Sequence, residues 1–188
     1  MARPKSDERR SAIVAAAIKV IAAQGLSAPT ALIAKEAAIS NGSLFTYFGT
    51  KTELLNQVYI DIKTEMAFAA SNGLPGVTDS KTQMAVMWNG WPLWSTMNTD
   101  KRRALAHLTV SDEITEESHE HGHRTMATVV RLLDNSRQNG AMREMPLALV
   151  ASILNAVADA TVNFITQDPT NAKSHIDSSF RAIWLMIA

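Results

Sequence analysis

The strongest constraint on the fold is a short stretch, residues 32–51, in which two helical patterns are separated by a tight turn. The second pattern begins after Ser40, a residue favoured at helix N-termini because its hydroxyl accepts a hydrogen bond from a free backbone N–H. Leu44, Phe45 and Phe48 follow at helical spacing and are predicted to point inward. The stretch therefore predicts two short helices joined by a turn.

The other side of this second helix is polar. Asn41, Ser43, Thr46 and Tyr47 offer small hydrogen-bonding groups and one phenol, and Lys51 adds a positive charge behind them. Such a face suits base edges and phosphate oxygens, which proteins contact with these groups. The predicted DNA-binding residues are Lys5, Thr30, Ser40, Asn41, Gly42, Ser43, Thr46, Tyr47 and Lys51.

These residues resemble the DNA-binding signature of the TetR family of repressors. The resemblance is carried by Ile33-Ala34, Ile39-Ser40, Gly42-Ser43-Leu44-Phe45, Tyr47-Phe48 and Lys51-Thr52-Glu53-Leu54. The chain has Ala38 where the family usually has Gly, so the turn is either strained by about 1 kcal/mol or avoids positive φ. It also has Phe45 where the family more often has Tyr, so a hydroxyl contact is absent there.

Charge is unevenly distributed along the chain. Residues 1–51 carry 7 Lys and Arg against 3 Asp and Glu, a net charge of +4, and the remainder carries 11 against 15, a net charge of −4. A basic N-terminal region followed by an acidic remainder is expected of a DNA-binding protein with a separate second domain. The chain has no cysteine and its charged start has no apolar segment, which fits a cytoplasmic protein without a signal peptide.

Helical spacing continues to the end of the chain, and no strand pattern is present. Helices are predicted at residues 6–24, 29–37, 40–48, 50–66, 81–97, 100–109, 111–139, 146–167 and from 168 onward. Ser80 and Gln83 have capping-box spacing, and Gly90 and Pro92 predict a kink or break. The expected fold is all-α: a helix-turn-helix three-helix domain at residues 1–49, then a larger helical ligand-binding and dimerisation domain at residues 50–188.

The resemblance also implies an assembly and a mode of regulation. Two closing apolar helices resemble the dimerisation pair of the family, which implies a homodimer joined by a four-helix bundle. The alternative is that both helices fill the core of a monomer. Looser matches at residues 1–6, 88–89, 110–117 and 168–169 resemble a multidrug-sensing member of the family. They imply a repressor that leaves operator DNA when an amphipathic compound binds.

Large soft side chains between residues 84 and 97 predict a ligand pocket. Trp offers flat stacking faces and Met adapts to irregular shapes, although ordinary core packing would use the same residues. The segment holds Met84, Met87, Trp88, Trp91, Trp94 and Met97. The predicted ligand-binding residues are Tyr59, Ile62, Met66, Trp88, Trp91, Leu133, Leu154 and Asp159.

A polar stripe interrupts the most apolar predicted helix at Ser152, Asn155, Asp159 and Asn163. Because burying an unpaired carboxylate is costly, Asp159 could favour a cationic lipophilic ligand. The alternative places the stripe at a hydrated dimer seam. Asn155, Asp159 and Asn163 also argue against a membrane-spanning segment at residues 147–165.

Residues 119–123 match the zinc-protease pattern His-Glu-x-x-His. His119 and His123 would share a helix face and Glu120 could act as general base. Gly122 weakens the helix and no third ligand is evident, so no catalytic residue, metal or cofactor is predicted. The sequence thus favours a ligand-responsive transcriptional repressor over a zinc-dependent hydrolase or a helical interaction protein without DNA binding.

Overall fold

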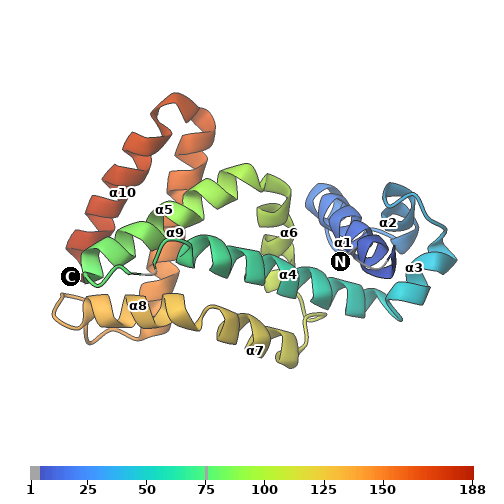
Figure 1. Ribbon diagram of the computed structural model, residues 1–188, viewed down its shortest axis with the longest axis horizontal. Coiled ribbons are helices and arrows are strands. Elements are labelled where there is room, and N and C mark those ends of the chain that lie inside the picture. Colours follow the sequence, from blue (N-terminus) through green and yellow to red (C-terminus); the bar gives the residue numbers. More distant parts are fainter. Residues whose placement is uncertain (1–4, 75) are drawn as a thin grey trace. The chain divides into compact units, whose positions relative to one another are not determined.

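A computed structural model describes residues 5–74 and 76–188, with side chains from Ser6 onward. Its described residues form helices and connecting turns, without a strand, so the all-α prediction is confirmed (Figure 1). The helices are α1 Lys5–Gln24, α2 Thr30–Glu36, α3 Asn41–Tyr47, α4 Lys51–Ser71, α5 Ser80–Met97, α6 Thr99–Thr109, α7 Glu116–Thr125, α8 Ala127–Arg137, α9 Leu147–Gln167, the 3-10 helix η1 Pro169–Asn171 and α10 Ala172–Ile187.

The chain divides into two compact units. The first contains residues 1–63 and 98–123, and the second contains residues 64–97 and 124–188. In the first unit α1 packs against α2 and α6, and α2 packs against α3. The inward face of α1 and the start of α4 fill its core with fully buried aliphatic side chains, among them Ile13, Ile21, Leu54 and Leu55.

A buried amide joins the start of α4 to the loop before α7. The Asn56 Nδ2 donates to the carbonyl oxygens of Thr52 (2.7 Å) and Glu113 (2.8 Å), and its Oδ1 accepts the Thr115 backbone N–H (2.9 Å). The Thr52 hydroxyl also donates to the Glu113 carboxylate at 2.8 Å. These bonds satisfy polar groups that would be costly to leave unpaired inside the unit.

The predicted long helix at residues 111–139 is wrong. Residues 111–115 form turns, α7 begins at Glu116, and the backbone of Met126 (φ −83°, ψ 0°) separates α7 from α8. Helix α7 begins after residue 111 because the Thr115 N–H donates to Asn56 instead of to a helix carbonyl. The Thr115 hydroxyl then caps the helix by accepting the Ser118 N–H at 3.3 Å.

In the second unit α5 packs against α8, α9 and α10, which are seen beside one another in Figure 1. Asp79, not Ser80, caps α5, because its carboxylate accepts the Thr82 N–H at 2.8 Å. Helix α5 continues unbroken through Gly90 and Pro92. A Cβ on Gly90 would lie 2.2 Å from the Ala69 carbonyl oxygen, so this glycine allows a close approach of the two backbones.

The two closing helices are α9 and α10, as predicted. Within the described residues, α9 is the one helix long and apolar enough to cross a bilayer by length and composition, which differs from the sequence expectation. The core helix of a helical domain passes the same test. Its inward residues, including Val150 and Leu154, are buried in the core that it shares with α5 and α10.

Candidate nucleic-acid interface

Helix α3 begins at a well-formed cap. The Ser40 backbone is extended (φ −73°, ψ 152°), and its Oγ accepts the Ser43 N–H at 3.0 Å, as predicted. The two serine hydroxyls are also 2.9 Å apart. One turn later the Thr46 hydroxyl donates to the Ser43 carbonyl at 2.7 Å. The cap fixes where the helix starts and therefore which side chains face outward.

The turn before α3 is strained at Ala38, where φ is +54°. The Ile39 N–H donates to the Ala34 carbonyl (3.0 Å) and the Ala38 N–H to the Lys35 carbonyl (3.1 Å). This pair of bonds is a Schellman motif, in which the left-handed position is normally glycine. Of the two alternatives from the sequence, the strained turn is the one observed.

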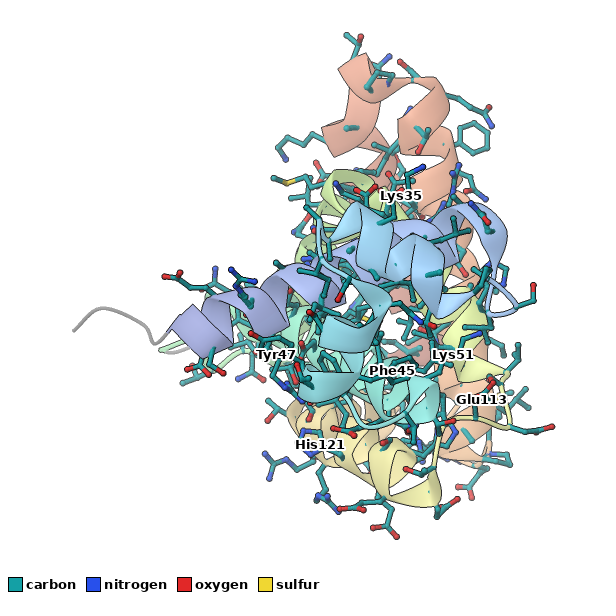
Figure 2. The ribbon with its side chains drawn as sticks, turned by 90° about the vertical axis from the view of Figure 1, so that its right-hand side faces the viewer. Lys35, Phe45, Tyr47, Lys51, Glu113 and His121 are labelled. Atoms are coloured by element: carbon teal, nitrogen blue, oxygen red, sulfur yellow. The ribbon has the colours of Figure 1, made fainter. Side chains whose placement is uncertain are left out.

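Most of the predicted DNA-binding residues lie on α3 or at the starts of the neighbouring helices α2 and α4, and two of them, Tyr47 and Lys51, are labelled in Figure 2. Ser40, Asn41, Gly42 and Thr46 are exposed, and Thr30, Ser43, Tyr47 and Lys51 are half-buried. The side chain of Lys5 lies outside the described residues. The exposed members of the set form one outward face of α3, with backbone N–H groups of the first turn alongside.

The inward position predicted for Phe45 is wrong. Leu44 and Phe48 are fully buried, but Phe45 is 40% exposed and lies on the outward face of α3 (Figure 2). The reason is geometric: residues 44 and 48 are four apart and share one stripe, whereas residue 45 is turned about 100° away from it. A seven-residue helix that packs mainly against α2 buries only one stripe.

Lys51 has a structural partner. Its Nζ donates to the Leu26 carbonyl, which fastens the loop between α1 and α2 to the start of α4. The ammonium group has two further N–H donors that can reach a phosphate. Beside it, Thr50 Oγ1 accepts the Glu53 N–H at 3.0 Å. The Glu53 carboxylate accepts the N–H of Gly49, at 2.8 Å, rather than that of Thr50, so the two residues form a capping box shifted by one residue.

Arg10 is a supporting residue that the sequence did not reveal. Its guanidinium lies 4.5 Å above the ring centre of Phe48 and donates to the Gln57 side-chain oxygen at 3.0 Å. Gln57 in turn donates to Asp61 at 2.7 Å. These contacts cover Phe48 at the end of α3 and connect it to α1 and α4. Arg10 is 38 positions from Phe48 and 47 from Gln57, so no local sequence pattern predicts them.

The predicted ligand-binding residues are mostly core residues of their units. In the first unit Tyr59 and Ile62 are buried; in the second, Met66, Trp88, Leu133 and Leu154 are buried, Trp91 is half-buried and Asp159 is exposed. The Trp88 indole N–H donates to the Ser179 hydroxyl at 2.9 Å. Their role in ligand binding stays a prediction.

The predicted zinc pattern lies on α7, and His119 packs against Tyr59. The Tyr59 oxygen and His119 Nδ1 are 3.4 Å apart, and the rings meet edge-on with centroids 5.4 Å apart. A Cβ on Gly122 would lie 3.2 Å from the phenol oxygen, so the glycine makes room for it. Burial raises the pKa of Tyr59 and lowers the pKa of Lys63, whose Nζ lies 5.6 Å from the ring centre. No group of three His, Cys, Asp or Glu side chains among the described residues is placed to hold a metal ion.

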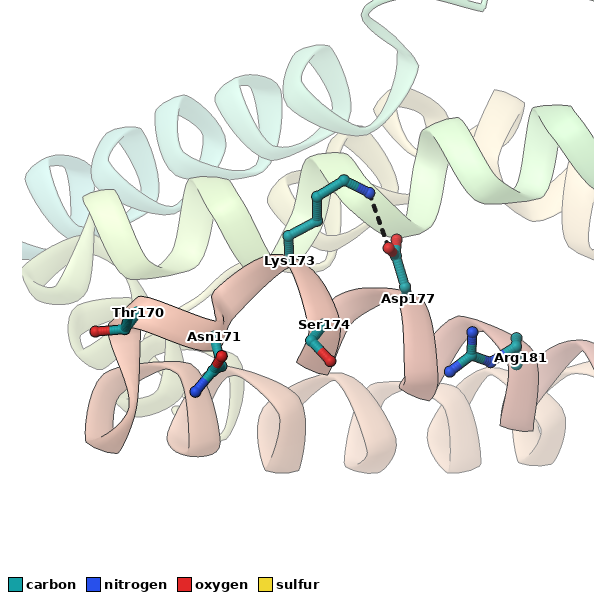
Figure 3. A pocket seen from close by; sticks show the side chains of 6 residues that line it. All are labelled: Thr170, Asn171, Lys173, Ser174, Asp177 and Arg181. Atoms are coloured by element: carbon teal, nitrogen blue, oxygen red, sulfur yellow. Dashed lines mark hydrogen bonds and ion pairs between the residues drawn. The ribbon is translucent and has the colours of Figure 1, made fainter.

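A shallow polar cleft lies along η1 and α10 (Figure 3). It is lined by Thr170, Asn171, Lys173, Ser174, Asp177 and Arg181. Lys173 and Asp177, one turn apart on α10, form an ion pair at 2.8 Å, so their opposite charges neutralise each other. The cleft lacks the aromatic walls expected of a site for amphipathic ligands.

Comparison with known proteins agrees with this geometry. Residues 13–58 match the model of the bacterial regulatory proteins of the tetR family. Similar structures include a TetR family transcription regulator from Marinobacter aquaeolei VT8 (21% identity, TM-score 0.85, covering 97% of each chain) and a putative one from Shewanella sp. PV-4 (23% identity, TM-score 0.81, covering 94% of this chain and 96% of the other). The regulator LfrR from Mycobacterium smegmatis, solved in complex with proflavine, matches at 15% identity and a TM-score of 0.66, covering 93% of this chain and 94% of its own. The chain therefore has the fold of TetR-family transcription regulators, and its residues 13–58 carry the sequence pattern of that family's regulatory proteins.

Proposed function

We propose that the protein is a dimeric transcriptional repressor that binds operator DNA and releases it when an amphipathic aromatic or cationic small molecule binds. The observation that carries the DNA-binding part is the outward face of α3, where a capped helix start presents Asn41, Gly42, Thr46 and Tyr47 together. Side-chain amides and hydroxyls of this kind bind base edges and phosphates. The excess of basic residues in the first 51 positions supports the same proposal.

The outward faces of α9 and α10 support a homodimer. Leu149 is 48% exposed, Phe164 is 60% exposed and Leu185 is 81% exposed, although all three lie on helices whose other faces are buried. Ser152, Asn155, Asp159 and Asn163 are exposed along α9 between the first two of these side chains, as the dimer-seam alternative requires. Pairing of two copies through these helices would make a four-helix bundle.

The proposed effector is an amphipathic or aromatic compound, and its site is proposed within the second unit, at Met66, Trp88, Trp91, Leu133, Leu154 and Asp159. Support comes from the aromatic content of α5, in which Trp91 and Trp94 stack with centroids 5.5 Å apart. The looser sequence matches resemble the multidrug-sensing repressor RamR, and LfrR, of similar fold, has been solved with proflavine. Efflux regulation, a cytoplasmic location and the absence of a membrane role are part of the same proposal.

The two alternatives receive less support. A zinc-dependent hydrolase would need a third ligand beside His119 and His123, but no group of three His, Cys, Asp or Glu side chains in the described part of the chain is placed to hold a metal ion. A helical interaction protein without DNA binding does not account for the capped start of α3 and its exposed polar face.

DNA binding is tested by Thr46→Ala and Tyr47→Ala, with Thr109→Ala as a matched control. Thr109 makes the same kind of intrahelical bond as Thr46, from its hydroxyl to the Leu105 carbonyl at 2.8 Å, but it lies on α6. We expect the two α3 variants to weaken operator binding by about fivefold or more, the weight of a lost base or phosphate contact, and the control to stay within about twofold. Equal binding by wild type and Tyr47→Ala would contradict the proposed docking.

The effector is tested by titrating a cationic dye and an anionic bile-salt-like amphiphile against wild type and Asp159→Asn. Tryptophan fluorescence reports binding and a labelled operator reports release. Because a ligand shifts the equilibrium only if it prefers the form that does not bind DNA, both readouts are needed. If only the cationic dye binds less tightly to Asp159→Asn, the carboxylate is a ligand partner; if neither changes, Asp159 belongs to the dimer seam.

A further inference from the structure

We infer that the buried hydroxyl of Ser95 is the polar contact of the effector site, where it forms a hydrogen bond with a hydroxyl or carbonyl group on an aromatic ligand. The inference rests on the proposed function and narrows the ligand class to aromatic ring systems that carry a hydrogen-bonding group at one end. Ser95 lies near the end of α5, is 1% exposed and belongs to the second unit.

The hydrogen bonding of Ser95 differs from that of similar residues in the same unit. Its hydroxyl oxygen is buried and has no hydrogen-bond partner within the described part of the chain. Ser136 and Thr161 are also buried helical residues, and each donates its hydroxyl to the carbonyl oxygen four residues earlier at 2.8 Å. A buried hydroxyl without a partner destabilises the folded state. A ligand that supplies the partner would remove this penalty when it binds.

Ser95 lies on the aromatic face of α5. Trp91 is four residues before it and Trp88 is seven residues before it, a spacing that places all three on one side of an α-helix. Trp88 belongs to the core of the second unit, and Trp91 is half-buried and packs against that core. The Trp88 indole N–H already donates to the Ser179 hydroxyl at 2.9 Å, whereas the Ser95 hydroxyl is available to a ligand.

The spacing along the helix indicates the size of the ligand. Trp91 and Ser95 are separated by one turn, about 6 Å along the helix axis. Two fused aromatic rings are long enough to lie against the Trp91 indole and place a substituent at the Ser95 hydroxyl. Aromatic stacking would then hold the rings, and the hydroxyl would select ligands by their polar group.

The backbone beside these residues has one hydrogen bond fewer than a regular helix. Pro92 lies inside α5 and has no N–H to donate to the Trp88 carbonyl, four residues earlier. A turn with a missing backbone hydrogen bond adjusts at lower cost than the rest of the helix. Such an adjustment is what entry of a flat ligand beside the half-buried Trp91 requires.

The first experiment compares 2-naphthol with naphthalene, which share the same rings and differ by one hydroxyl group. Equilibrium dialysis measures the binding of each compound to full-length wild type and to Ser95→Ala. We expect wild type to bind 2-naphthol about fivefold to tenfold more tightly than naphthalene, the weight of a hydrogen bond to a buried hydroxyl. Ser95→Ala should bind naphthalene as wild type does and lose the preference for 2-naphthol.

The second experiment measures thermal unfolding without ligand. Ser95→Ala should raise the midpoint by about 1–4 °C, because it removes a buried hydroxyl that has no partner. Ser136→Ala is the matched control, since its hydroxyl is buried and bonded. It should not raise the midpoint, and it should keep the preference for 2-naphthol. A lower midpoint for Ser95→Ala would show that its hydroxyl is already bonded in the folded protein and would overturn the inference.

The binding data separate this inference from the proposed function. Equal affinities of wild type for 2-naphthol and naphthalene would overturn the inference and leave the proposed function standing, because an aromatic compound would still bind. Failure of wild type to bind either compound would also overturn the inference. The proposed function is tested independently by the titration of the cationic dye with operator release as its readout.

Discussion

Ala38→Gly is expected to stabilise the protein, because Ala38 is held in the left-handed region by its neighbours. Its φ of +54° completes the Schellman motif, whose two hydrogen bonds to Ala34 and Lys35 leave little freedom to relax. An L-residue other than glycine costs about 1–2 kcal/mol in this conformation. Glycine removes the strain, and the side chain lost is only an exposed methyl group.

The gain is partly offset in the unfolded chain. Glycine has more conformational freedom to lose on folding, at a cost of about 0.5–1 kcal/mol relative to alanine. The net stabilisation is therefore about 0.5–1 kcal/mol, which raises the midpoint of thermal unfolding by about 1–4 °C for a chain of this length. Chemical denaturation measures the free energy of unfolding and calorimetry measures the midpoint.

Ala37→Gly is the matched control. Ala37 is the adjacent residue, and its φ of −78° gives a glycine no strain to relieve. It should destabilise the protein by about 0.5–1 kcal/mol through the entropy of the unfolded chain. The reasoning is refuted if Ala38→Gly destabilises the protein as much as Ala37→Gly does.

Three further predictions concern stability. Gly90→Ala should cost about 1–3 kcal/mol in urea unfolding, because its Cβ would lie 2.2 Å from the Ala69 carbonyl oxygen; a neutral effect would show that the two helices are not so close. Asn56→Ala should cost about 1–3 kcal/mol, since it leaves buried backbone partners on Glu113 and Thr115 unpaired, and an unchanged thermal midpoint would contradict the network. Hydrogen bonds from Thr82 lower the pKa of Asp79 below its ordinary value of 3.8, so the carboxylate stabilises the fold above that value and ceases to do so as pH falls through the folded pKa. Wild type and Asp79→Ala should therefore differ in unfolding free energy at neutral pH and converge in acid, and a constant difference would contradict the titration.

Local signals in the sequence predicted the parts of the fold that depend on neighbouring residues. Ser40 caps α3 and Thr50 caps α4 because each hydroxyl reaches an N–H three residues ahead, a spacing visible in the sequence. The inward stripe of Leu44 and Phe48 follows from the helical period. The same period could have placed Phe45 on the outward face, so that error came from assigning every apolar residue to the core.

Other features depend on partners distant in sequence, which a local pattern does not contain. The late start of α7 follows from Asn56, 59 residues before Thr115. The contact between the Arg10 guanidinium and the Phe48 ring joins residues 38 positions apart in the sequence. At α5 the capping-box spacing indicated Ser80, but the structure shows that the carboxylate of the preceding residue, Asp79, accepts the Thr82 N–H.

The most direct test of the central claim is selection of duplexes from a random DNA pool by the full-length protein. The account predicts enrichment of an inverted repeat whose half-sites are about one helical turn apart, centre to centre, because two α3 helices of a dimer would enter successive major grooves. Binding should weaken steeply with salt, and the same selection with Tyr47→Ala should lose the enrichment. No enrichment by wild type, or the same repeat recovered with equal strength by Tyr47→Ala, would contradict the assignment of α3 as the DNA-reading helix.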